Sequence, residues 1–103
     1  MDIIKNQEGS RVNIALKGRL DTTTSPQLEA ELRPVLSEAT ELNFDLADLQ
    51  YVSSAGLRVF LSAQKVMNKQ GDMTLRNVSP EIMEIFEVTG FVDILNIESS
   101  EKG

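Results

Sequence analysis

The stretch YVSSAGLRVF, residues 51–60, places two serines and a glycine between two segments of different hydrophobic periodicity. In residues 41–52, apolar and polar side chains alternate as they do along a half-buried strand. From Ser54 onward, apolar side chains recur with the period of a helix, and Gly71 stands at the expected C-cap. The stretch therefore predicts a strand that passes directly into a long helix.

The other strands are expected on both sides of this junction. Residues 3–18 alternate around a turn at 8–10 and predict a hairpin of two strands. Residues 73–78 and 92–97 also have the composition of strands.

Two more helices are expected, each opened by a Ser-Pro pair. Ser25 is the expected N-cap of one, with Pro26 as its first helical residue, and this helix is expected to kink or end at Pro34. Residues 79–89 repeat the Ser-Pro opening, and Gly90 is the expected terminator. The resulting order, β-β-α-β-α-β-α-β, predicts a single α/β domain: a mixed, mostly parallel sheet with helices packed against it and an N-terminal hairpin.

Composition excludes several classes of function. The chain of 103 residues has no cysteine and no histidine, which excludes disulfides, thiolate or imidazole metal sites and Ser-His-Asp hydrolysis. The net charge of -6, with scattered Lys and Arg, argues against a nucleic-acid partner. No apolar run approaches the roughly 20 residues of a membrane span, and the first residues do not resemble a signal peptide. The sequence therefore predicts a cytoplasmic protein that contacts neither nucleic acid nor membrane.

The two serines of the junction have two alternative roles. Ser54 is expected at or beside the helix N-cap, where its oxygen can accept an amide hydrogen bond. A phosphate on it would meet free N–H groups and the positive end of the helix dipole. Local chemistry favours the cap, and both roles stay open at this point. A hydrolase nucleophile is excluded, because Val52 occupies the first glycine position of a Gly-x-Ser-x-Gly motif.

Three carboxylates fall near predicted strand ends. Asp21 follows a strand and precedes a helix, so it is expected at the same sheet edge as Ser54, with an Asx turn as its alternative role. Asp45 and Asp48 bracket Leu46-Ala47 and are expected at the end of the central strand, and with Asp21 they are candidate ligands for a divalent cation. Their spacing matches no defined ligand pattern, so a solvated strand end is preferred, and neither a metal nor a cofactor is predicted.

Three stretches together carry a resemblance to a known family: GRLDTTTSPQLEAEL at 18–32, NFDLADLQYVSSAGLRVFL at 43–61, and GDMTLRNVSPEIMEIFEVTGFVDIL at 71–95. In order and spacing they resemble the STAS domain of bacterial anti-sigma-factor antagonists. The resemblance covers about residues 3–97, so residues 1–103 are expected to form one STAS domain with a polar tail at 98–103.

The resemblance implies a partner-switching protein rather than an enzyme. In this family an anti-sigma factor with serine-kinase activity phosphorylates the antagonist, and a serine phosphatase removes the phosphate. Only the unmodified antagonist sequesters the anti-sigma factor and frees the sigma factor. The alternative is a STAS scaffold or signalling module of a larger regulatory assembly that does not act on a sigma factor.

Carried onto this sequence, the resemblance places the phosphoacceptor at Ser54. The family often has aspartate just before the acceptor, and this chain has Ser53, which is a rival acceptor. The expected docking face is the loop 48–57 with the start of the following helix, together with Asp21 and Asp45. Its other expected members are Asp48, Ser53, Ala55, Gly56, Leu57 and Arg58.

Overall fold

The computed structural model describes residues 1–99 and contains a five-stranded sheet in the order β1-β2-β3-β4-β5. Strand β1 pairs antiparallel with β2, and β2 to β5 run parallel to one another. The predicted mixed, mostly parallel sheet with an N-terminal hairpin is therefore confirmed. The strands are β1 (Asp2–Glu8), β2 (Arg11–Leu20), β3 (Glu41–Val52), β4 (Asp72–Val78) and β5 (Ile97–Ser99).

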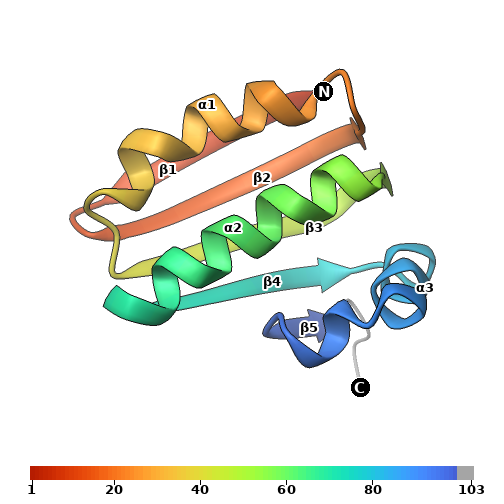
Figure 1. The fold of residues 1–103 in the computed structure, drawn as a ribbon. Coiled ribbons are helices and arrows are strands. Elements are labelled where there is room, and N and C mark those ends of the chain that lie inside the picture. The colour runs from red at the N-terminus through yellow and green to blue at the C-terminus, as the bar shows by residue number, and fades with distance from the viewer. Residues whose placement is uncertain (100–103) are drawn as a thin grey trace.

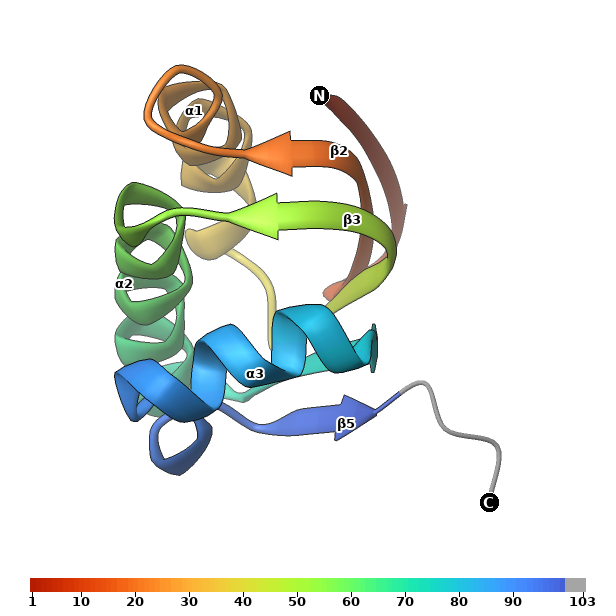
Figure 2. The same ribbon diagram turned by 90° about the vertical axis from the view of Figure 1, so that its right-hand side faces the viewer.

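Helices cover one face of the sheet. Helices α1 (Ser25–Leu36) and α2 (Ser54–Gln70) lie side by side on this face (Figure 1). Helix α3 (Pro80–Thr89) and the short 3-10 helix η1 (Phe91–Asp93) pack beside the end of the sheet (Figure 2). Among the described residues, the opposite face of the sheet carries no helix. No helix within residues 1–99 has both the length and the apolar composition that crossing a membrane requires.

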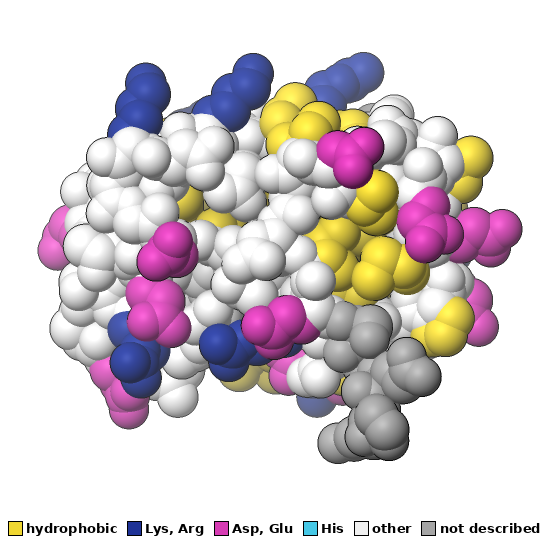
Figure 3. Space-filling view, turned by 90° about the horizontal axis from the view of Figure 1, so that it is seen from below, with side chains coloured by type: hydrophobic (Ala, Val, Ile, Leu, Met, Phe, Trp, Pro, Cys, Tyr) yellow, Lys and Arg dark blue, Asp and Glu magenta, His cyan; other side chains and the backbone are white. Residues whose placement is uncertain are grey.

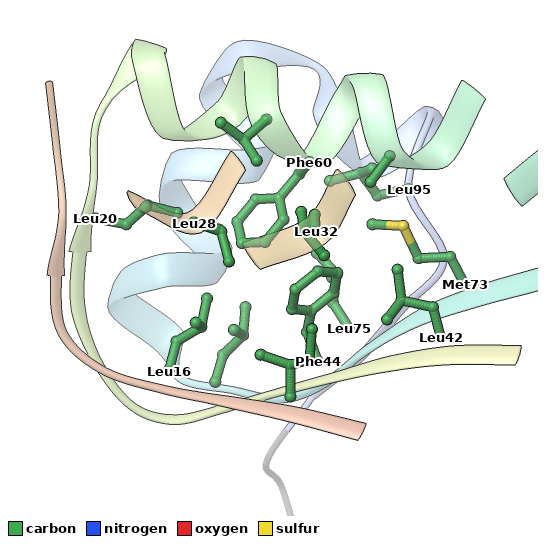
Figure 4. Packing of buried hydrophobic residues seen from close by; sticks show 14 of the residues in the cluster. Leu16, Leu20, Leu28, Leu32, Leu42, Phe44, Phe60, Met73, Leu75 and Leu95 are labelled. Carbon is green, nitrogen blue, oxygen red and sulfur yellow. The ribbon is translucent and has the colours of Figure 1, made fainter. Parts of the chain in front are cut away.

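The core lies between the sheet and the helices. Phe60 of α2 points down onto Phe44 of β3, and their ring centroids are 5.2 Å apart in an edge-to-face arrangement (Figure 4). Phe86 of α3 meets Phe60 in the same way at 6.3 Å. All three rings are fully buried, so this aromatic chain joins β3, α2 and α3 into one core.

The start and end of α1 differ from the sequence prediction. The N-cap is Thr24 rather than Ser25, and Ser25 is buried as the first helical residue, with its Oγ donating to the carbonyl of Asp21 at 2.6 Å. The helix does not end at Pro34 but continues to Leu36, since Pro34 already lies in its last turn. Pro34 cannot donate to the carbonyl of Ala30, and the helix continues past this one missing bond to Leu36.

The predicted strand at 92–97 is wrong for most of its length. Gly90 ends α3 in the left-handed conformation, as predicted, and the chain then forms η1. The N–H groups of Ile94 and Leu95 donate back to the carbonyl of Phe91, so they are unavailable to a sheet. Of the described residues after Gly90, only Ile97–Ser99 pair with β4, and this strand takes in Glu98 and Ser99 of the predicted polar tail. Residues 100–103 lie outside the described part of the chain.

Helix α2 begins at Ser54 and has Gly71 as its C-cap, as predicted. Its first turn lies unusually close to the strand ends at Gly56. A Cβ atom built on Gly56 would stand 2.7 Å from Cγ of Leu20 and 2.9 Å from Cγ2 of Val52, both of which are buried. Helix α2 can approach β2 and β3 this closely only because residue 56 has no side chain.

We expect Gly56→Ala to lower the free energy of unfolding by about 1–2 kcal/mol, because the overpacking outweighs the gain in helix propensity. Urea unfolding followed by circular dichroism measures this. The matched control is Ser62→Ala, an exposed site on the same helix, which should be neutral or slightly stabilising. A Gly56→Ala midpoint equal to or above that of the unmodified protein would contradict the packing argument.

Candidate functional site

The candidate site lies at the edge of the sheet where β2, β3 and β4 end. Each of these parallel strands leads into the N-terminus of a helix at this edge (Figure 1). The backbone N–H of Ser53 donates to the carbonyl of Leu20 at 2.8 Å. This bond ties the β3–α2 junction to the end of β2, so the structure brings Asp21 close to the two serines, as predicted.

The two serines have different environments. Ser53 is the N-cap of α2, half-buried, and its Oγ accepts from the backbone N–H of Gly56 at 3.4 Å. Ser54 is the first helical residue and is exposed, and its hydroxyl makes no hydrogen bond within residues 1–99. Ser53 therefore supplies the cap, and Ser54 presents a free hydroxyl at the positive end of the helix dipole.

Asp21 organises the loop between β2 and α1. Its Oδ1 accepts from the backbone N–H groups of Thr23 and Thr24, at 3.0 and 3.1 Å. These bonds form an Asx turn, which is the alternative role that the sequence allowed. Hydrogen bonding from the backbone of Thr24, more than any other contact, holds the pKa of Asp21 below its ordinary value of 3.8.

Two residues that the sequence analysis missed stand at the rim of the site. The guanidinium of Arg19 lies over the ring of Tyr51, 4.5 Å from its centroid, and Arg19 Nε is 4.0 Å from Oδ2 of Asp21. Register places Arg19 opposite Tyr51 on β2 and β3. No local motif signals this pair, because it depends on how two distant segments align.

A groove of about 350 Å³ runs between the N-terminal halves of α1 and α2. The groove was also missed from the sequence, which does not show that these two helix starts face each other. Its mixed polar and apolar lining consists of Thr22, Ser25, Pro26, Glu29, Ala55, Arg58, Val59 and Ser62.

Helix α2 presents a basic surface behind Ser54. Arg58, Lys65 and Lys69 are exposed along it, and the sequence has no Asp or Glu between Asp48 and Asp72. Arg58 lies one helical turn beyond Ser54, on the same side of the helix. A negative group on Ser54 would therefore lie near both the helix N-terminus and a guanidinium.

The remaining predicted contact residues do not all reach this surface. Gly56 and Leu57 are buried, so they shape the junction from below. Asp45 lies in the middle of β3, about 23 Å before Val52 at roughly 3.3 Å per residue, and Asp48 lies between them.

Asp45 has a structural role of its own, since its Oδ1 accepts from the N–H of Ala47 at 3.0 Å and from Asn77 at 3.1 Å. The bond to Ala47 falls where the pairing of β2 with β3 is bulged. Asp21 thus lies just beyond the end of β2, whereas Asp45 lies within β3. Within residues 1–99 no three carboxylates come together as a cation site would require.

Comparison with known proteins places the chain among anti-sigma-factor antagonists. A relative in Bacillus subtilis (strain 168), named anti-sigma-B factor antagonist, is 34% identical over 104 residues, which span 100% of this chain and 94% of the relative. The relative of the same name in Listeria monocytogenes is 31% identical over 100 residues, covering 95% of this chain and 88% of the relative.

The fold agrees with this similarity. The structure of the anti-sigma factor antagonist SpoIIAA in its unphosphorylated form superposes with a TM-score of 0.77 at 18% identity, covering 98% of this chain and 90% of that one. SpoIIAA of Bacillus in its phosphorylated form superposes with a TM-score of 0.74 at 20% identity, covering 93% and 90%. The family model described as "Mlab, STAS domain" matches residues 3–96, and the chain therefore belongs to the STAS domain family.

Proposed function

We propose that this protein is an anti-sigma-factor antagonist whose binding is switched by phosphorylation of Ser54. One observation carries the choice of residue: the hydroxyl of Ser54 is exposed and free, whereas that of Ser53 is half-buried and bonded to Gly56. A kinase needs an accessible hydroxyl that can leave its local contacts. Relatives that share about a third of their residues with this chain are named antagonists of an anti-sigma factor, which supports the same role here.

The proposed partner is an anti-sigma factor with serine-kinase activity, and a serine phosphatase reverses the modification. The kinase supplies the ATP, because this sequence has no glycine-rich phosphate loop. The chain itself acts as a binding regulator in the cytoplasm and not as an enzyme. Neither nucleic acid nor a membrane takes part.

The proposed docking face is centred on the two linked loops at the sheet edge. Asp21, Ser54 and Arg58 supply exposed or half-exposed polar groups there, and Ala55 lines the adjoining groove. Gly56 and Leu57 contribute through packing, since both are buried. Asp48 and Asp45 join this face only where the partner extends back along β3.

Phosphate on Ser54 would change the surface much more than the fold. A phosphoserine adds about -1.5 to -2 charges, and the helix dipole offsets about 0.3–1 kcal/mol per unit charge at an exposed site. Arg58, one turn away, adds further favourable charge. At the partner interface, however, the same strongly hydrated group must be desolvated or lie against the partner's own groups.

The first prediction concerns the acceptor. Incubation with the anti-sigma-factor kinase of the same organism and ATP should phosphorylate the protein at one site. Ser54→Ala should abolish incorporation, and Ser53→Asn should retain most of it, because asparagine preserves the N-cap without a hydroxyl. Mass spectrometry of the peptides locates the phosphate. Loss of incorporation in Ser53→Asn alone would move the switch to Ser53.

The second prediction concerns binding. Stoichiometric phosphorylation should weaken binding to the anti-sigma factor 100- to 1000-fold, which corresponds to about 3–4 kcal/mol, and should shift the thermal midpoint by only a few degrees. Calorimetric titration and thermal unfolding of the same samples measure both effects, with Ser54→Ala as the unmodifiable control that binds normally. Equal affinity of the two forms would refute partner switching. Capture of a signalling assembly without any anti-sigma factor would favour the scaffold alternative.

The third prediction separates the structural role of Asp21 from a role in docking. Since the pKa of Asp21 is lowered on folding, its stabilising effect is present above its ordinary value of 3.8 and disappears as the pH falls through the lowered value. Asp21→Asn should therefore lower the thermal midpoint at pH 7. At low pH the midpoints of the variant and of the unmodified protein should become equal. Asp21→Asn should also weaken binding of the anti-sigma factor at pH 7.

Glu41→Gln is the matched control. The pKa of Glu41 is also lowered, mainly by a hydrogen bond from Asn43, but this residue lies at the opposite end of β3. Its stability should show the same convergence at low pH, while binding stays unchanged. Normal binding by Asp21→Asn would leave Asp21 with a structural role only.

A further inference from the structure

A second surface, which shares no residue with the Ser54 site, combines exposed apolar side chains with carboxylates. We call it the α3–η1 patch and define it by Val88, Phe91, Val92 and Ile94. Val88 is 78% exposed and Ile94 48% exposed, while Phe91 and Val92 are partly buried against the core. Seen from below, apolar side chains gather on one side of this face with Asp and Glu around them, while Lys and Arg line its upper edge (Figure 3). Large apolar side chains that stay exposed together are typical of a contact surface.

The local structure holds these side chains outward. Ile82 and Phe86 turn the inner side of α3 into the core, which leaves Val88 on the outer side. After Gly90, the N–H groups of Ile94 and Leu95 both donate to the carbonyl of Phe91. Leu95 is buried to 5% exposure by this turn, and its neighbour Ile94 is left outside. The exposure is therefore built into hydrogen-bonded structure.

The segment that carries the patch has charges of one sign. The sequence contains no Lys or Arg from residue 77 to residue 101. Glu81, Glu84 and Glu87 recur along the exposed side of α3, and Asp93 stands within η1. Helix α2, and not the segment that carries the patch, contains the basic residues Arg58, Lys65 and Lys69. A partner that covers the patch must therefore bring apolar side chains flanked by positive charge.

We propose that the α3–η1 patch is the docking surface for a basic amphipathic helix of a partner protein. Apolar side chains at helical spacing would cover Val88 and Ile94, and flanking Lys or Arg would meet the carboxylates of α3. A second copy of this chain is a poorer occupant. Its basic surface lies on α2, and none of the large apolar side chains that are exposed in residues 1–99 lies on that helix. The patch includes no residue of the Ser54 site, so this contact neither uses nor requires the phosphorylation switch.

The test uses the full chain, labelled with nitrogen-15, and a synthetic peptide of about 14 residues with Leu and Lys at amphipathic helical spacing. Its Leu/Glu counterpart serves as the charge control. The Leu/Lys peptide should shift the amide signals of residues 81–95. Its affinity should fall in high salt, and it should be the same for phosphorylated and unmodified protein. The Leu/Glu peptide should not bind.

Variants decide which surface is responsible. Two double variants should each lower the affinity for the Leu/Lys peptide at least tenfold. One combines Val88→Ser with Ile94→Ser, and the other combines Glu84→Gln with Glu87→Gln. Ile4→Ser is the matched control, since Ile4 is 50% exposed on the strand β1, and it should leave binding unchanged. The proposal would be overturned if the peptide shifted only amide signals from the sheet face that carries no helix. Unchanged affinity in the patch variants would also overturn it. Self-association of the unmodified protein that Val88→Ser abolishes would assign the patch to a second copy and overturn it equally.

Discussion

The absence of a side chain at Gly56 is the constraint on which the site depends. Leu20 and Val52 lie where a Cβ atom would stand, so α2 starts directly on the ends of β2 and β3. The N–H of Ser53 donates to the carbonyl of Leu20 where the pairing of β2 with β3 ends. Ser53 is the cap because its Oγ accepts from the N–H of Gly56, and Ser54 follows as the first, exposed residue of the helix. The cap bond thus occupies one of the two adjacent hydroxyls and leaves the other free.

The same edge of the sheet is rigid on its other side for a different reason. Asp21 closes its loop through backbone hydrogen bonds from Thr23 and Thr24, and Ser25 Oγ donates to its carbonyl. The loop is therefore held by its own polar groups, while the α2 junction is held by packing. A docking face built from two preorganised loops loses little conformational freedom when a partner binds.

Charge is divided between neighbouring helices. Helix α2 carries exposed Arg58, Lys65 and Lys69, whereas the segment from residue 77 to residue 101 has carboxylates and no basic residue. The net charge of -6 thus conceals two surfaces of opposite sign. Such a division favours partners that approach in one orientation, because each surface repels what the other attracts.

The sequence by itself determined the order of elements, the parallel sheet, the start of α2 at Ser54 and the closeness of Asp21 to it, because periodicity and helix-end residues are local signals. Only the tertiary structure decided that Ser53 is the cap and that Arg19 stacks on Tyr51. It also decided that Asp45 accepts the N–H of Ala47 at a bulge in β3, away from the site. The lost strand at 92–97 has the same origin: residues 94 and 95 have strand-like side chains, but their N–H groups bond to Phe91. Contacts between distant segments follow from register and packing, which local sequence patterns do not contain.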